Sequence, residues 1–170
     1  MILNILIIVL VIAADQITKA WAVSALTGID TMPLIQDVLH VTYVENRGAA
    51  FGMLADQRWV FMVLSVVGIA ALFAWMSIDK TISRPMKSIL AMIIGGGIGN
   101  MIDRVMLGYV VDFIDCRFID FYVFNVADSF VTVGCVLFVL LLSIEEYKNA
   151  KKKKAAETAG EVTEDGADHE

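Results

Sequence analysis

Residues 109–130 carry four aspartates in a chain that is otherwise strongly apolar, namely Asp112, Asp115, Asp120 and Asp128. Asp128 belongs to an apolar segment of about residues 124–144, which can cross a bilayer because a spanning helix needs about 20 residues. An ionised side chain inside such a segment costs about 2.5–3.5 kcal/mol or more, so an intramembrane acid indicates a functional site. Asp112 stands shortly upstream, and we expect Asp112 and Asp128 to meet in one membrane-embedded cleft.

A pair of aspartates in one cleft suits the chemistry of aspartic peptidases. Two carboxylates that share a site do not both ionise easily, so one keeps its proton while the other stays charged. The ionised carboxylate takes a proton from water as the water attacks a carbonyl carbon, and the protonated one donates to the carbonyl oxygen. This reaction needs no metal ion or cofactor, and we predict neither. The sequence contains no HExxH or GxSxG motif.

Cysteine chemistry is a weaker interpretation of the same region. Cys116 and Cys135 lack the spacing of a metal site. A thiol nucleophile at Cys116 would need a basic partner. The histidines are His40, which we expect on the surface, and His169, which lies in the C-terminal tail.

The composition is that of an integral membrane protein. The chain of 170 residues is 58% hydrophobic with a mean hydropathy of +0.73, whereas soluble domains are about 45–50% apolar. The net charge is −6, but residues 145–170 contribute −3 of it, since they hold five lysines against eight acids. The acidity is therefore not a binding surface of the apolar core, and no basic patch indicates a nucleic-acid partner.

The hydrophobic pattern predicts an all-α integral membrane protein whose membrane domain covers residues 1–147. Four transmembrane helices are expected, at about residues 2–26, 59–78, 88–107 and 124–144. Residues 27–58 form a polar loop that we expect to act as a lid, and residues 39–43 within it alternate like a half-buried strand. Residues 108–123 have a partly extended pattern, so a small extracytoplasmic β element is expected. Residues 148–170 are predicted to be a disordered, charged cytoplasmic tail.

Basic residues predict the orientation. The short second loop carries Lys80, Arg84 and Lys87, and lysines 148 and 151–154 follow the last span. Both regions, and with them both termini, are expected in the cytoplasm. The spans then carry their polar residues at one shared depth near the outer leaflet, namely Asp15, Lys19, Asn100, Asp103, Arg104, Asn125 and Asp128. Charges that only pair with one another need not share a depth, so we predict an active site there.

Asp15 and Lys19 are four residues apart and lie on one face of a helix. In one interpretation they form an ordinary ion pair along the helix and neutralise each other. Because two charges facing lipid are costly, we favour the other interpretation, in which the pair faces the polar cavity that holds the aspartates. Lys19 and Arg104 are candidates to balance charge or to fix a substrate carbonyl. Three amides are candidates to donate to the backbone of a bound peptide: Asn46, Asn100 and Asn125.

Two other classes of protein fit parts of the pattern. A small proton- or ion-coupled transporter also places acids in its spans, but it needs a polar path through both leaflets, and the segments ILIIVLVI and VLFVLLLS contain no ionisable residue. A structural or chaperone-like membrane protein explains the spans but not the shared depth of the acids.

The third expected span contains a run of glycines, namely Gly95, Gly96, Gly97 and Gly99. In a membrane such small residues let another backbone approach closely. A nucleotide-binding glycine loop would instead need a βαβ frame.

Five motifs occur in order along residues 15–129: DQITK at 15–19, ENRGAAF at 45–51, GGGIGNMIDR at 95–104, VVDFID at 110–115 and FNVADS at 124–129. In sequence, order and spacing they resemble the motifs of lipoprotein signal peptidase, the bacterial signal peptidase II family. The resemblance implies a multi-pass aspartic endopeptidase of the bacterial cytoplasmic membrane. It implies removal of signal peptides from prolipoproteins by cleavage before a cysteine that carries a diacylglyceryl group.

The resemblance also assigns roles to residues and partners. It implies that Asp112 and Asp128 are catalytic, and that the supporting polar residues are Asp15, Lys19, Asn46, Gly48, Asn100, Asp103, Arg104, Asn125 and Ala127. The implied partners are diacylglyceryl-modified prolipoproteins and membrane lipid. Inhibition by the cyclic peptide globomycin is also expected.

Overall fold

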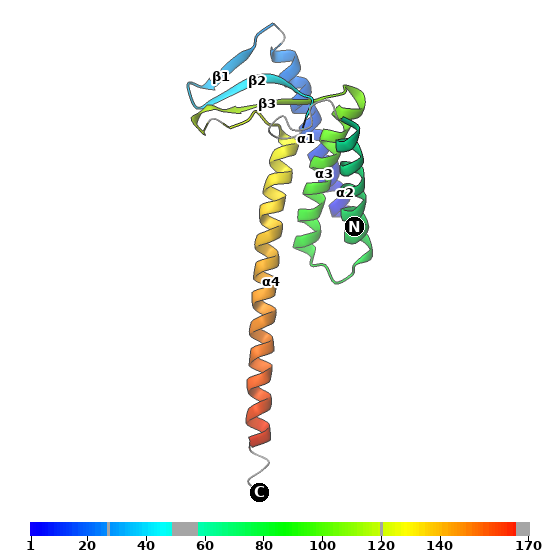
Figure 1. Ribbon diagram of the computed structural model, residues 1–170, viewed down its shortest axis with the longest axis vertical. Coiled ribbons are helices and arrows are strands. Elements are labelled where there is room, and N and C mark those ends of the chain that lie inside the picture. The colour runs from blue at the N-terminus through cyan, green and yellow to red at the C-terminus, as the bar shows by residue number, and fades with distance from the viewer. Residues whose placement is uncertain (27, 49–57, 120, 166–170) are drawn as a thin grey trace. The chain divides into compact units, whose positions relative to one another are not determined.

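The computed structural model describes residues 1–26, 28–48, 58–119 and 121–165 (Figure 1). Its helices are α1 (Ile2–Leu26), α2 (Arg58–Ile78), α3 (Arg84–Met106) and α4 (Val126–Asp165), and its strands are β1 (Thr31–Ile35), β2 (Leu39–Asn46) and β3 (Val110–Cys116), followed by the short 3-10 helix η2 (Arg117–Ile119). The chain divides into two compact units, Met1–Cys135 and Val136–Glu170. The site lies in the first of them.

In the part of the chain that the structure describes, three helices are long and apolar enough to cross a membrane: α1, α3 and the Val126–Lys151 part of α4. Exposed leucine, isoleucine and valine side chains along α1 and α4 suit helices that face lipid. In α2 the described apolar segment is the shorter Met62–Ile78. The predicted integral membrane fold with a small β element is thus confirmed, whereas the fourth span stays a prediction.

Glycines allow α3 to pack closely against its neighbours. A Cβ atom added to Gly95 would lie 2.8 Å from Cβ of Val11 on α1, and one added to Gly96 would lie 2.6 Å from the carbonyl oxygen of Ala127 on α4. These distances are shorter than van der Waals contact, so only glycine fits at this separation. The expected close approach of another backbone to the glycine run is confirmed.

The three strands form an antiparallel sheet in the order β1-β2-β3. It packs on the end of α1, where Ala22 and Leu26 form a buried core with Val41 and Phe113. The chain reaches β3 directly from α3 through Gly108, whose φ of 90° suits glycine after a helix end. The sheet therefore lies on the helices that carry the polar residues. Within the segment expected to act as a lid, residues 27–58, the part up to Asn46 forms β1 and β2 of this sheet. Residues 49–57 lie outside the described residues.

The C-terminal segment differs from the sequence prediction. Where a disordered tail is expected from residue 148, the structure continues α4 to Asp165. The physical reason is intrinsic propensity, because this segment is rich in lysine, alanine and glutamate, which favour helix even without an apolar face. The predicted division into a membrane domain and a tail stays a prediction.

Candidate active site

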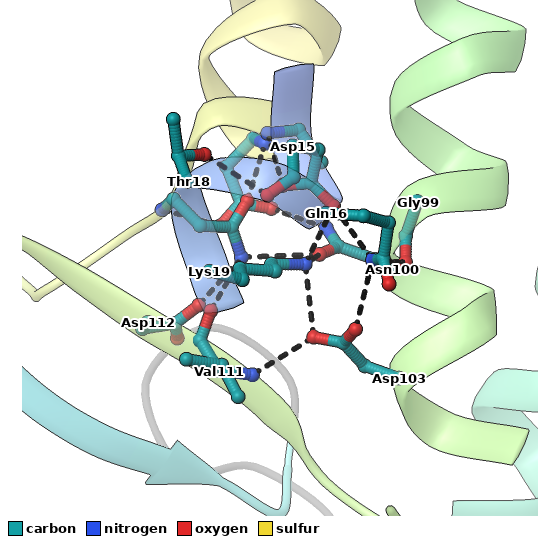
Figure 2. A network of polar contacts seen from close by, with 12 residues as sticks. Asp15, Gln16, Thr18, Lys19, Gly99, Asn100, Asp103, Val111 and Asp112 are labelled. Atoms are coloured by element: carbon teal, nitrogen blue, oxygen red, sulfur yellow. Dashed lines mark hydrogen bonds and ion pairs between the residues drawn. The ribbon is translucent and has the colours of Figure 1, made fainter. Parts of the chain in front are cut away.

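A buried amine lies at the centre of the polar residues of α1 and α3. Nζ of Lys19 lies 2.9 Å from Asp15 Oδ2 and 3.0 Å from Asp103 Oδ2, and it donates to Asn100 Oδ1 at 2.9 Å (Figure 2). The side chains of Lys19, Asp15 and Asp103 are at most 4% exposed. A lone ion would be costly at such a position, so the pairing is what makes it tolerable. We call Asp15, Lys19 and Asp103 the ion triad.

The two carboxylates of the ion triad also bind backbone groups of other elements. Asp15 Oδ1 accepts from the N–H of Ala127 at 3.0 Å, in the first turn of α4, where N–H groups lack helical partners. Asp103 Oδ2 accepts from the N–H of Val111 on β3 at 3.0 Å (Figure 2). The ion triad therefore fixes the start of α4 and the start of β3 relative to α1 and α3.

Two asparagines connect Asp112 and Asp128. Asn125 Nδ2 donates to Asp112 Oδ1 at 2.6 Å and to Asn100 Oδ1 at 3.0 Å. Asn100 Nδ2 in turn donates to Asp128 Oδ1 at 2.7 Å. Asn100 also accepts from Lys19, so one chain of hydrogen bonds joins both aspartates to the ion triad.

Local backbone structure explains why Asn125 reaches Asp112. After η2 the chain returns to pair Phe124 with Ile114, with hydrogen bonds between their backbone groups at 2.7 and 3.0 Å. Asn125 follows at once and caps α4, since its Oδ1 accepts from the N–H of Asp128 at 2.9 Å. A side-chain oxygen at this position satisfies an otherwise unpaired helix N–H.

A cleft of about 910 Å³ opens beside the two aspartates, a size typical of ligand sites. Its polar lining includes Asn46, Gly48, Asn100, Arg104, Asp112 and Asp128, and its apolar lining includes Val44, Val110, Phe121, Tyr122, Val123, Phe124 and Val133. Asn46 Nδ2 donates to Asp112 Oδ2 at 2.9 Å and its Oδ1 accepts from the N–H of Gly48 at 3.1 Å. The cleft thus presents two carboxylates against a largely apolar wall.

Asp112 lies on β3 and is 1% exposed. Burial is the main reason that the pKa of Asp112 is raised to about 6, and the nearby charge of Asp128 raises this pKa as well. The hydrogen bonds from Asn46 and Asn125 act in the opposite direction and lower the pKa. A carboxylate with this pKa can exchange a proton near neutral pH, as a general acid or base must.

The structure brings together all eleven residues that the resemblance assigned to the site. Gly48 and Ala127 take part through backbone N–H groups, and Arg104 lies at the cleft wall. The other eight contact one another through their side chains: Asp15, Lys19, Asn46, Asn100, Asp103, Asp112, Asn125 and Asp128. Asp115 lies apart and binds Thr42 and Arg117 instead. Asp120 lies outside the described residues.

Sequence reasoning missed Gln16. Its Nε2 donates to Asp103 Oδ1 at 2.9 Å, and it lies 3.2 Å from both Asp15 Oδ2 and the carbonyl oxygen of Gly99 (Figure 2). Gln16 therefore supplies a neutral donor to two carboxylates that share a single lysine. Its spacing of three residues from Lys19, which places both on one helix face, is the signal that could have found it.

Gly99→Ala is expected to reduce activity strongly and to destabilise the protein. An added Cβ would lie 2.6 Å from Asp15 Oδ2 and 3.4 Å from Cβ of Ala127, so Asp15 would have to move away from Lys19 and from the start of α4. Overpacking of this kind costs about 1–3 kcal/mol. The matched control is Gly68→Ala on α2, where nothing lies within 4 Å. Thermal unfolding and turnover of both purified variants check this, and equal behaviour of the two would contradict it.

The fold and site together define a multi-pass membrane protein whose cleft is lined by two aspartates joined through asparagines. The family model described as Signal peptidase (SPase) II matches residues 7–144. The chain belongs to the signal peptidase II family, and the resemblance found in its motifs is confirmed.

Relatives and solved structures agree with this assignment. The chain is 43% identical over 147 residues to a lipoprotein signal peptidase of Clostridioides difficile (strain 630), covering 86% of this chain and 99% of the relative. It is 42% identical over 144 residues to that of Streptococcus pyogenes serotype M5 (strain Manfredo), covering 85% and 95%. Two solved structures of bacterial membrane enzymes match with TM-scores of 0.76 and 0.71 at 33% and 34% identity. They cover 86% and 82% of this chain, and 90% and 91% of their own.

Proposed function

We propose that this protein is an aspartic endopeptidase that removes signal peptides from prolipoproteins, cleaving before a cysteine that carries a diacylglyceryl group. The observation that supports this most is the chain of hydrogen bonds from Asp112 through Asn125 and Asn100 to Asp128, with both carboxylates on one cleft. The names of the relatives, lipoprotein signal peptidases, support the substrate class.

In the proposed reaction one aspartate is ionised and the other protonated when the peptide binds. The ionised carboxylate removes a proton from a water molecule that attacks the scissile carbonyl carbon, and the protonated one donates to the carbonyl oxygen. When the tetrahedral intermediate collapses, the C–N bond breaks and the leaving amine takes up the proton that the first aspartate removed from water. The second aspartate recovers its proton from the hydroxyl group of the intermediate as the new carboxyl group forms. Asn100 and Asn125 hold the two carboxylates in place, since each donates to one of them.

The supporting residues divide into two groups in this proposal. The ion triad, together with the N–H of Ala127, positions α4 and β3, which carry the two catalytic aspartates. Arg104, Asn46 and Gly48 line the cleft and bind the peptide backbone. The guanidinium of Arg104 is suited to a substrate carbonyl because it presents several donors in a fixed geometry.

The apolar wall of the cleft suits a substrate that is partly lipid. Phe121, Tyr122 and Val133 contribute to it, and acyl chains of a modified cysteine would reach it from the membrane. We place the protein in the bacterial cytoplasmic membrane with both termini in the cytoplasm, so that the site serves the extracytoplasmic leaflet. A globomycin-type cyclic peptide is expected to occupy the same cleft.

Cleavage of a lipidated prolipoprotein by the purified protein tests the proposal, with the unlipidated form of the same substrate as the control and no metal added. A strong preference for the lipidated substrate, with a new N-terminus at the modified cysteine, is expected. Equal cleavage of both forms, or cleavage at another bond, would refute the assignment of the substrate.

The acidic side of the pH profile is expected to depend on Asp112. Below pH 6, where the pKa of Asp112 lies, both aspartates become protonated and no base remains, so kcat/KM should fall with decreasing pH. Asn46→Ala removes a donor to the ionised form of Asp112, which raises the pKa of Asp112. The acidic limb should therefore move to higher pH by on the order of one unit.

The matched control for Asn46→Ala is Glu45→Gln, which changes the neighbouring residue of β2 without removing a hydrogen bond to Asp112. It should not move the acidic limb upward. An acidic limb that stays in place in Asn46→Ala would show that Asp112 does not set it.

A further inference from the structure

One end of the sheet gathers five apolar side chains that are 39–63% exposed, which we call the sheet tip: Leu34, Ile35, Val38, Phe118 and Ile119. They come from two separate parts of the chain, the end of β1 with the turn that follows it and the short helix η2 after β3. Pairing of Leu39 with Cys116 and a hydrogen bond of 3.0 Å from the N–H of Arg117 to the carbonyl of Val38 join these two parts. The two parts of the sheet tip are therefore neighbours in space.

The sheet tip lies at one end of the sheet, away from α2 and α3 (Figure 1). Figure 1 shows the turn between β1 and β2 and the end of β3 at the same end of the sheet, away from α2 and α3. Short connections keep the sheet at the level of the helix ends, because β1 begins at Thr31 after α1 ends at Leu26, and β3 begins at Val110 after α3 ends at Met106. The sheet tip therefore lies at the level of the helix ends, at the end of the sheet away from α2 and α3 (Figure 1).

The chemistry of the sheet tip also favours lipid. Contiguous exposed apolar surface of this kind marks a site that binds a partner or a membrane. Among the described residues of the turn and of η2, the charged ones are Asp37 and Arg117, and Arg117 pairs with Asp115 at 3.0 Å. The sheet tip is thus mostly apolar, with Asp37 and the paired Arg117 as its charged neighbours, and such a surface suits contact with a membrane.

We propose that the sheet tip inserts into the leaflet on its side of the membrane and binds lipid acyl chains. Through β3 this contact fixes the height of Asp112 relative to the membrane surface. The inference concerns lipid binding and is independent of the proposed peptidase reaction.

Tryptophan fluorescence in lipid vesicles tests this contact directly. Phe118→Trp is prepared in a chain whose native tryptophans are changed to phenylalanine, namely Trp21, Trp59 and Trp75. The protein is reconstituted in phosphatidylcholine brominated along the acyl chains. We expect blue-shifted emission that the bromolipid quenches strongly and that aqueous acrylamide quenches weakly. Lys80→Trp in the same background, an exposed position in the loop between α2 and α3, should show the reverse.

Leu34→Trp provides a second probe from the other part of the sheet tip, should the change at Phe118 prevent folding. Strong quenching by acrylamide and none by bromolipid would overturn the proposal, since the vesicles contain no other protein and a surface meant for a protein partner would remain in water. Resistance to both quenchers would also overturn it, because the side chain would then be covered by this chain itself.

Discussion

Turnover of a lipidated prolipoprotein is expected to fall by about 10²–10⁴-fold when either Asp112 or Asp128 is changed to asparagine, the range that a positioned acid or base contributes. Asparagine keeps the size of the side chain but cannot exchange a proton. The two losses should not add when both changes are combined, because the pair acts as one unit. Turnover under single-turnover conditions, with the purified variants in detergent or lipid, checks this expectation.

The chain offers a matched control in Asp115→Asn. Asp115 lies on the same strand as Asp112 and is 9% exposed, but it binds Thr42 and Arg117 and does not line the cleft. Its variant should keep turnover near that of the wild type. A folded Asp112→Asn variant that was no slower than Asp115→Asn would show that the catalytic pair is assigned wrongly.

The gathering of the polar residues of α1 and α3 was predictable from the sequence. The lysines and arginines predict the direction of each span, and with those directions Asp15, Lys19 and Asp103 are expected at a similar height. Because an ionised side chain in lipid is costly, residues at one height are expected to face one another. The ion triad is the physical result of that requirement.

Contacts that depend on packing between elements could not be predicted from these patterns. The link from Asn125 to Asn100 depends on how closely α4 approaches α3, which Gly96 and Ala127 set through a backbone contact. Likewise, the irregular pairing between Val41 and Val44 decides which residues of β2 oppose Asp112. The spacing of apolar residues, every second residue in a strand or every 3.6 residues in a helix, carries no information about such irregular strand pairing.

The first strand of the sheet shows the same limit. The pattern of residues 39–43 predicts a strand where β2 lies, but the polar loop expected at residues 27–58 has no strand at the position of β1, which contains Pro33. Proline is tolerated in an edge strand, where its missing N–H is not needed, and β1 is at the edge of this sheet. Edge position is a property of the whole sheet and is not visible in the local sequence.

Removal of the charge of Lys19 is expected to destabilise the protein by about 3–5 kcal/mol, the cost of breaking a buried ion pair from one side. Lys19→Met keeps most of the side-chain volume but leaves Asp15 and Asp103 buried without their cation. Both carboxylates would still accept from Gln16, which limits the loss but does not remove the repulsion between them. Unfolding of the purified variant in detergent, followed by heat or denaturant, measures the change.

A double variant separates the charge of Lys19 from its packing. In Lys19→Met with Asp103→Asn, the second of the two facing carboxylates is neutral, so part of the lost stability should return relative to Lys19→Met alone. Lys80→Met, at an exposed position in the loop between α2 and α3, is the matched control and should have little effect. If Lys19→Met were as stable as Lys80→Met, pairing of charges would not hold the site together. The start of α4 and of β3 would then be fixed by their backbone hydrogen bonds and by glycine packing alone.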